Sequence, residues 1–292
     1  MNRVRTATLV VFCLFSASTA FSAANRVYVS AQKGDDANAC TLAAPCRQFT
    51  KAISVVNNGG DIIVLDSGGF QPFTVTIGVS IIADGVVADI ATTTDGIVIT
   101  TSYDVTLRGL TITGIGTING TAAIKMDTYS VLHVENCVVR GAFGYGIYTA
   151  TGKLFVQDTI VKNGIHYGML IYGSETSATV TRSSFLDIDQ YGVFVQGNSK
   201  VSIRDSVASG NGIGFHAEGA ELNIESSLAS KNVDGGVESA NGGVVRVSNS
   251  TITDNGQGLS QMGTSLLYSR GNNTVEGNTQ DIVGTITPYS PK

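Results

Sequence analysis

The sequence is poor in the residues that interrupt a chain or separate folded units. Its 292 residues include no tryptophan and only four prolines, and no proline- or serine-rich stretch divides them. We therefore expect one folded unit behind a short leader. Charged residues make up only 14% of the chain, and the formal net charge is −5. This acidic balance argues against nucleic acid as a partner, because phosphate binding needs clustered lysine and arginine.

Ligands for a metal ion are equally sparse. The three histidines, His133, His166 and His216, have no spacing with the cysteines that is typical of a zinc site. The carboxylates are too dispersed to supply the roughly 6–8 oxygens that calcium needs. We therefore expect no metal and no cofactor.

The one long apolar stretch lies near the N-terminus. Two arginines precede a largely apolar run over residues 7–15, and small residues follow at 22–24. This pattern predicts a secretory signal peptide over residues 1–24, cleaved after Ala24 or, alternatively, after Ala20. The run is too short to span a bilayer, and no other segment is long enough. The protein is therefore expected in the periplasm or outside the cell.

Export to an oxidising compartment permits a disulfide bond. Behind the leader the chain has three cysteines, of which Cys40 and Cys46 close the short loop CTLAAPC and form the expected pair. Cys137 is left over. Its place in the repeat described next predicts a small buried residue rather than a reactive thiol.

The chain does contain a regular sequence repeat. A glycine followed by an apolar residue recurs every 22 to 24 residues, at Gly146, Gly168, Gly192, Gly214, Gly236 and Gly258. A column of small residues runs in register with it, at Cys137, Thr159, Ser183, Ser206, Ser227 and Ser250. A further column is mostly asparagine, at Asn163, Asp187, Asn211, Asn232 and Asn255.

A fixed period of this size predicts a stacked repeat architecture. Apolar and polar residues alternate locally, as in Val201-Ser202-Ile203, which favours strands over helices. Each repeat is expected to be one coil of about three short strands, and stacking the coils buries their apolar faces. Like residues then stand about 4.8 Å apart. The glycines are expected at turns with positive φ, and the asparagines at a turn where amides bond from coil to coil.

These columns resemble those of the right-handed parallel β-helix proteins of the pectate-lyase-like superfamily. The resemblance covers about residues 61–281 and implies an all-β fold, a right-handed parallel β-helix. It is weak for function, because this fold carries many activities. We expect an N-terminal strand, disulfide loop and capping helix over 25–60, the β-helix over 61–281, and a loose C-terminal tail over 282–292.

The capping helix is expected within residues 45–56. Its apolar residues share one face at helical spacing, and the stretch 57–60, Asn-Asn-Gly-Gly, is expected to stop it. The residues of that face are Phe49, Ala52, Ile53 and Val56.

Two sets of residues are candidates for catalysis, and neither matches the signatures of calcium-dependent lyases or polygalacturonase-type hydrolases. Asp158, Arg182 and Asp205 fall in one column on consecutive coils, where they could position an anionic sugar. The favoured alternative is a charge ladder that avoids like-charge stacking at a turn. His216 and Glu238 are neighbours in the outward column and could form a general acid–base pair.

Aromatic residues suggest a binding face. Tyr145, Tyr167 and Tyr191 each precede a repeat glycine, and the outward slot of successive coils holds Tyr148, Leu170, Phe194 and His216. An exposed apolar face of this kind suits sugar binding or another interaction. Alternatively, the tyrosines stack as a turn ladder while the apolar residues of the outward slot lie under a loop.

The sequence therefore favours a secreted β-helix protein that binds a surface polysaccharide or a partner protein and has no clear catalytic site. One alternative is a divergent polysaccharide lyase or glycoside hydrolase. Another is a structural or adhesive surface protein. The sequence does not determine the oligomeric state.

Overall fold

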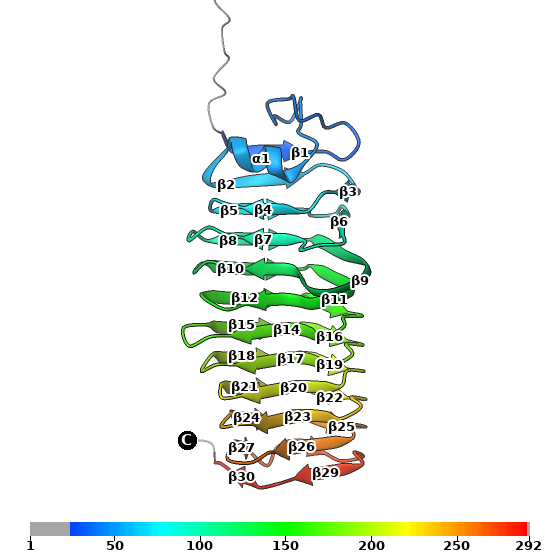
Figure 1. Ribbon diagram of the computed structural model, residues 1–292, viewed down its shortest axis with the longest axis vertical. Helices are drawn as coiled ribbons and strands as arrows, with labels where there is room; N and C mark the ends of the chain where they lie inside the picture. Colours follow the sequence, from blue (N-terminus) through cyan, green and yellow to red (C-terminus); the bar gives the residue numbers. More distant parts are fainter. Residues whose placement is uncertain (1–23, 291–292) are drawn as a thin grey trace, which may run out of the picture.

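The computed structural model describes residues 24–290, without the side chains of residues 117–119, so the predicted leader lies outside the described residues except for Ala24. The chain winds into a column of stacked coils (Figure 1). Helix α1 (Phe49–Val55) and strand β1 (Ala24–Val29) lie at one end, and the C-terminal strand lies at the other. Neighbouring coils pair through parallel strands, as in the expected parallel β-helix.

Most coils contain three strands, as the repeat predicts. The first strand of each coil belongs to a 12-stranded parallel sheet, called the first sheet here. Its strands after β1 are β2 (Val56–Val64), β5 (Val79–Ile82), β8 (Val105–Arg108), β10 (Val131–Glu135), β12 (Lys153–Gln157), β15 (Ser177–Thr181), β18 (Lys200–Arg204), β21 (Glu221–Glu225), β24 (Val244–Ser248), β27 (Leu266–Ser269) and β30 (Ile286–Pro288).

A second sheet of mostly short strands follows the first. It contains β3 (Gly68–Phe70), β6 (Ala88–Thr92), the first parts of β9 (Leu110–Met126) and β11 (Val138–Thr149), then β13 (Ile160–Lys162), β16 (Ser184–Leu186), β19 (Val207–Ser209), β22 (Leu228–Ser230), β25 (Thr251–Thr253) and β28 (Thr274–Val275). The long strands β9 and β11 continue without a break into the third sheet.

The third sheet completes each coil and carries the candidate site. It contains β4 (Phe73–Val75), β7 (Ile97–Ile99), the last parts of β9 and β11, then β14 (Tyr167–Tyr172), β17 (Tyr191–Gln196), β20 (Ile213–Glu218), β23 (Gly235–Ala240), β26 (Gln257–Gln261) and β29 (Gln280–Val283).

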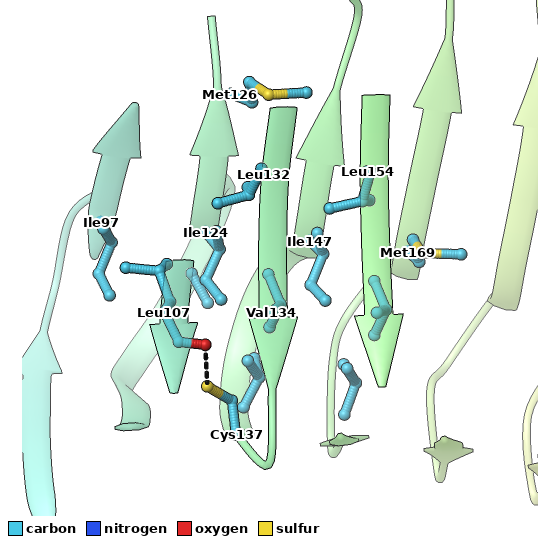
Figure 2. Packing of buried hydrophobic residues seen from close by; sticks show 14 of the residues in the cluster. Ile97, Leu107, Ile124, Met126, Leu132, Val134, Cys137, Ile147, Leu154 and Met169 are labelled. Atoms are coloured by element: carbon cyan, nitrogen blue, oxygen red, sulfur yellow. Dashed lines mark hydrogen bonds between the residues drawn. The ribbon is translucent and has the colours of Figure 1, made fainter. Parts of the chain in front are cut away.

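The core fills the space between the sheets. Alternate residues of the strands point inward, so that Leu132 and Val134 of β10 meet Ile124 and Ile147 of the third sheet (Figure 2). All four are at most 1% exposed. Burying one such side chain contributes about 1.5–3 kcal/mol to stability. A coil gains this only when its neighbours cover it, which explains why the coils stack.

The column of small residues lies inside the coils, where it links each coil to the next. The backbone N–H of Thr159 donates to Oγ of Ser183 (3.2 Å), and that of Ser183 donates to Oγ of Ser206 (3.2 Å). Cys137 occupies the same column and is 1% exposed, which confirms that it is a small buried residue. Its Sγ donates to the carbonyl oxygen of Leu107 (Figure 2).

The asparagine column was aligned wrongly at its first two positions. Asn163 and Asp187 are exposed, with φ of 61° and 54°, and lie one position before the buried slot. The buried ladder begins at Asn211 and continues through Asn232 and beyond, each Nδ2 donating to Oδ1 of the amide on the next coil (2.8–3.0 Å). Its buried members are Asn211, Asn232 and Asn255, and the half-buried Asn278 accepts the last of these hydrogen bonds.

The expected reason for the repeat glycines is also wrong. They do not adopt positive φ; that conformation belongs to other glycines, such as Gly152 (φ 80°) and Gly197 (φ 72°), and to turn residues such as Asp158 (φ 49°). A Cβ on Gly192 would instead lie 2.6 Å from the carbonyl oxygen of Gly214 on the next coil. The glycines are needed because the backbones of adjacent coils approach closely.

The ends of the column differ from expectation in two details. Helix α1 buries the predicted face, with Phe49 packed on Phe70 and Phe73, but it ends at Val55, and residues 57–60 already belong to β2. The disulfide loop beside it joins Cys40 to Cys46. The C-terminal segment is not wholly loose, because β30 pairs with β27 and adds the last strand of the first sheet.

Candidate functional site

The outer face of the third sheet gathers most of the residues that the sequence singles out. Parallel pairing sets Tyr148, Leu170, Phe194, His216 and Glu238 side by side on consecutive strands, from β11 to β23. The same register aligns Tyr145, Tyr167 and Tyr191 three residues earlier. Two adjacent outward columns therefore run along this face, and both follow from the repeat spacing.

The three tyrosines form a stacked row. The rings of Tyr145 and Tyr167 are 5.5 Å apart and nearly parallel, at 3°, and those of Tyr167 and Tyr191 are 5.5 Å apart at 11°. Each ring is half-buried, so the row keeps an accessible edge. Burial raises the pKa of Tyr167 and of Tyr191, which keeps both phenols neutral and able to donate hydrogen bonds.

The row covers part of the neighbouring column, as the alternative of a stacked tyrosine ladder beside covered apolar residues predicts, although tyrosine rings and not only a loop lie over them. The ring of Phe194 lies 5.3 Å from that of Tyr167 and 4.9 Å from that of Tyr191. Leu170, Phe194 and His216 are only 9%, 7% and 4% exposed. They point outward from the sheet, but other side chains shield them from solvent. Of the two columns, the accessible residues therefore include the tyrosine row and Tyr148, and Tyr172, two residues after Leu170 on β14, is also exposed.

A hollow of about 210 Å³ opens at that end of the face. Its walls are the rings of Tyr145 and Tyr148, which lie 5.4 Å apart and 50° inclined, together with Asp95, Lys125 and the backbone near Gly120 and Ala122. The two rings thus form an aromatic corner beside charged groups. Burial raises the pKa of Tyr148, so its hydroxyl is a neutral donor.

The charged groups of the hollow are paired with one another. Nζ of Lys125 lies 3.1 Å from a carboxylate oxygen of Asp127 and 3.8 Å from one of Asp95. The hydrogen bond from Lys125 to Asp127 raises the pKa of the ammonium. The other Asp95 oxygen accepts from the backbone N–H of Ala122 (2.8 Å). Sequence reasoning missed both aspartates, although Asp95 precedes Gly96-Ile97 and Ile97 aligns with Ile124 of the next coil, so that Asp95 occupies the slot that Tyr145 occupies further along.

His216 and Glu238 are brought together as the repeat predicts. Nδ1 of His216 lies 3.0 Å from Oε1 of Glu238, although at an angle outside hydrogen-bond geometry. On its other side, Nε2 lies 4.0 Å from Oε2 of Glu218. The imidazole stacks on Phe194, with ring centroids 4.7 Å apart. Sequence reasoning missed Glu218, which follows His216 by two residues and therefore lies on the same side of β20.

The other catalytic candidates lie elsewhere, at the turn between the first and second sheets. Arg182 donates to both carboxylate oxygens of Asp158, at 2.8 and 2.9 Å. This pairing lowers the pKa of Asp158. Asp205 follows on the next coil, also at positive φ, but the two guanidinium hydrogen bonds of Arg182 go to Asp158. All three side chains are exposed, and the arrangement is that of a surface charge ladder.

A second hollow, of about 320 Å³, lies on the outer face of the first sheet, and its lining includes Thr181 and Arg204, which immediately precede Arg182 and Asp205. Thr179, Ser202 and Asn223 line it, with Arg246 and Tyr289. Between residues 24 and 290 we find no group of three or more histidine, cysteine, aspartate or glutamate side chains placed to hold a metal ion. No helix within the same residues is long and apolar enough to span a membrane.

The coils, their three sheets and their inward ladders define a right-handed parallel β-helix. The family model described as a right-handed beta helix region matches residues 122–280, which is more than half of the chain. The protein therefore belongs to the right-handed β-helix family. No curated protein sequence matches it.

Several solved structures share the fold at low sequence identity. XylC in complex with xylose is 9% identical, covers 85% of this chain and 69% of its own, and has a TM-score of 0.55. The pectate lyase Pel9A is 17% identical, with coverages of 92% and 78% and a TM-score of 0.49. A lacto-N-biosidase from Eubacterium ramulus is 10% identical, with coverages of 90% and 68% and a TM-score of 0.47. At these identities the likeness concerns the fold alone.

Proposed function

We propose that this protein binds carbohydrate through the outer face of the third sheet. The observation that carries the proposal is the row of half-buried tyrosines, Tyr145, Tyr167 and Tyr191, which leads into the hollow beside Tyr148. Partly exposed aromatic rings offer apolar surface on which the C–H groups of a sugar pack, while nearby polar groups bond to its hydroxyls. XylC, solved in complex with xylose, and the pectate lyase Pel9A have similar folds, and both agree with this class of ligand.

The best residue for testing the proposal is Tyr148. Phe194 is buried under the tyrosines, so its replacement would disturb packing as well as binding. Tyr148 is half-buried at the wall of the hollow. We expect Tyr148→Ala to weaken binding to the glycans that the protein retains on an array by about tenfold or more, as for other aromatic anchor residues.

Phe155→Ala is the matched control. Phe155 is an exposed aromatic residue on the outer face of the first sheet, 38% accessible and stacked on His133. Its removal should leave glycan binding unchanged. Equal losses in both variants, or no loss in Tyr148→Ala with its melting temperature intact, would refute the assignment of the site to the third sheet.

A second candidate function is the alternative reading as a polysaccharide lyase or glycoside hydrolase. The observation that favours it is the placement of His216 between Glu238 and Glu218, next to the tyrosine row. A histidine between two carboxylates has the composition of a general acid–base group. Reducing-end and unsaturated-product assays on anionic and neutral glycans test it. If the wild type turns over one of these glycans and Glu238→Gln does not, catalysis at this site is established. If no glycan of the panel is turned over, carbohydrate binding without catalysis remains the proposed function.

The proposal also includes export from the cytoplasm, because the sequence predicts an N-terminal signal peptide. Residues 1–24 would direct export, residues 25–60 would cap the column with the Cys40–Cys46 loop and α1, and residues 61–281 would form the β-helix before a C-terminal tail. N-terminal sequencing of protein recovered outside the cytoplasm tests the cleavage. An N-terminus at residue 21 or 25 is the expected result, and recovery of the intact chain from the cytoplasm would contradict it.

A further inference from the structure

The charged groups in and next to the hollow beside Tyr148 include two carboxylates and one cation: Asp95 and Lys125 line the hollow, and Asp127 pairs with Lys125. By formal charge, Asp95 and Asp127 count as two negative groups, and Lys125 is the one cation paired with them. The three groups therefore sum to −1. The whole chain is also acidic, with a formal net charge of −5. The formal charge balance of this group and that of the whole chain therefore both disfavour an anionic ligand.

The cation of the hollow is already engaged. Nζ of Lys125 is held 3.1 Å from Asp127 and 3.8 Å from Asp95. An incoming carboxylate would have to displace Asp127 or lie beside Asp95 without a counter-charge of its own. A hydroxyl group meets neither obstacle, because it can donate to the Asp95 carboxylate and accept from the remaining ammonium protons.

The size and walls of the hollow suit one ring. Its volume of about 210 Å³ is roughly seven times the ~30 Å³ that a water molecule occupies in the liquid. It is smaller than the ~300–1,000 Å³ of pockets that enclose larger ligands. Tyr145 and Tyr148 offer two inclined rings, so a pyranose can lay its C–H face on one while its edge meets the other.

We propose that this hollow is a subsite for a single uncharged sugar ring, and that the Asp95–Lys125–Asp127 group excludes the corresponding uronic acid. This inference rests on the proposed carbohydrate-binding function and adds the class of sugar. The Asp95 carboxylate, which lines the hollow, orients hydroxyl groups, and Lys125 pairs with it and with Asp127, which does not line the hollow and adds negative charge only. Discrimination comes from the surplus negative charge.

The test uses matched pairs of methyl glycosides: glucose and glucuronate, galactose and galacturonate, mannose and mannuronate. Binding to the full-length purified protein is measured by saturation-transfer NMR and titration at low ionic strength. We expect at least one neutral sugar to bind about tenfold more tightly than its uronate, the order expected for a like charge about 4 Å away in a partly solvated hollow.

Asp127→Asn sharpens the test, because it removes one negative charge and frees Lys125. In this variant the uronate of the preferred pair should bind about tenfold better, while the neutral sugar changes by less than about twofold. Asp254→Asn makes the same change in net charge at an exposed turn of a C-terminal coil and should alter neither affinity.

The outcomes separate the two proposals. A uronate that binds as tightly as its neutral partner, or an Asp127→Asn variant with unchanged selectivity, overturns the charge-exclusion inference and leaves carbohydrate binding intact. No signal from any of the glycosides, together with silence on the glycan array, overturns both.

Discussion

The interior of the coils and the outer face of the third sheet obey different rules. Inside, Thr159, Ser183 and Ser206 repeat the same chemistry and make the same bond to the next coil. Outside, the column that contains Tyr148 changes at every step, from lysine through tyrosine, leucine and phenylalanine to histidine and glutamate, and the neighbouring column repeats tyrosine on only three coils. An interior residue must fit identical neighbours above and below. An outer residue is free of that demand, so a cluster there is not imposed by the fold and is where function should be sought.

The largest effect is expected from a substitution in the interior glycine column, which tests this comparison through the stability of the stacked coils. Gly192→Ala places a Cβ 2.6 Å from the carbonyl oxygen of Gly214 and 3.0 Å from Nδ2 of Asn211. Because the first of these atoms belongs to the backbone of a neighbouring coil, relief requires the coils to move apart. We expect a loss of about 3 kcal/mol in the free energy of unfolding, measured by urea denaturation.

Gly69→Ala is the control for this prediction. The same added carbon at exposed Gly69 meets its nearest atom, the carbonyl oxygen of Asp89, at 4.0 Å. Its effect should stay within about 0.5 kcal/mol. Similar losses in the two variants would mean that glycine at the repeat position serves backbone flexibility and not the close approach of coils.

The interior also makes a prediction for pH. Burial raises the pKa of the Cys137 thiol from 9.0 to about 12. The folded state therefore keeps its proton above pH 9, where the unfolded chain loses it. This contribution to stability is complete below about pH 9 and falls as pH rises towards 12, by about 1.4 kcal/mol for each pH unit.

Cys137→Ser isolates this effect, because serine occupies the same column in the next coils and does not ionise in this range. Between pH 8 and pH 10, the unfolding free energy of the wild type should fall relative to that of the Cys137→Ser variant. The native thiol should also resist alkylation until the chain unfolds. Rapid labelling of the folded protein at pH 8 would show that the site is open.

Much of the interior could be read from the sequence because stacking forces like residues into one register. The repeat period gave the coils and the buried position of Cys137. The predicted alignment of the repeats is wrong where two neighbouring repeat positions accept the same residue types. Asn163 and Asp187 suit the positive-φ turn, Asn211 suits the buried ladder one position later, and spacing alone does not separate them.

The outer face was predictable in its alignment but not in its accessibility. Register placed Tyr167, Tyr191 and Phe194 together, yet the burial of Phe194 depends on the way in which the tyrosine rings lean over it. The hollow was harder still. Asp95 precedes β7 and meets Lys125 of β9 through parallel pairing of coils whose repeat pattern is weak in the sequence.

The smallest expected effect concerns the exposed turn column. Asp158→Asn removes the ion pair with Arg182, but asparagine also accepts positive φ, and both partners face solvent. The lowered pKa of Asp158 makes its pairing stabilising at neutral pH, and this contribution disappears as pH falls and the carboxylate is protonated. Solvent screening keeps it small, so the melting temperature at pH 7 should shift by less than about 2 °C and the shift should vanish in high salt.

Glycan binding and any turnover should not change in Asp158→Asn. Loss of either in a folded Asp158→Asn protein would place function at the turn and break the contrast drawn with the third sheet.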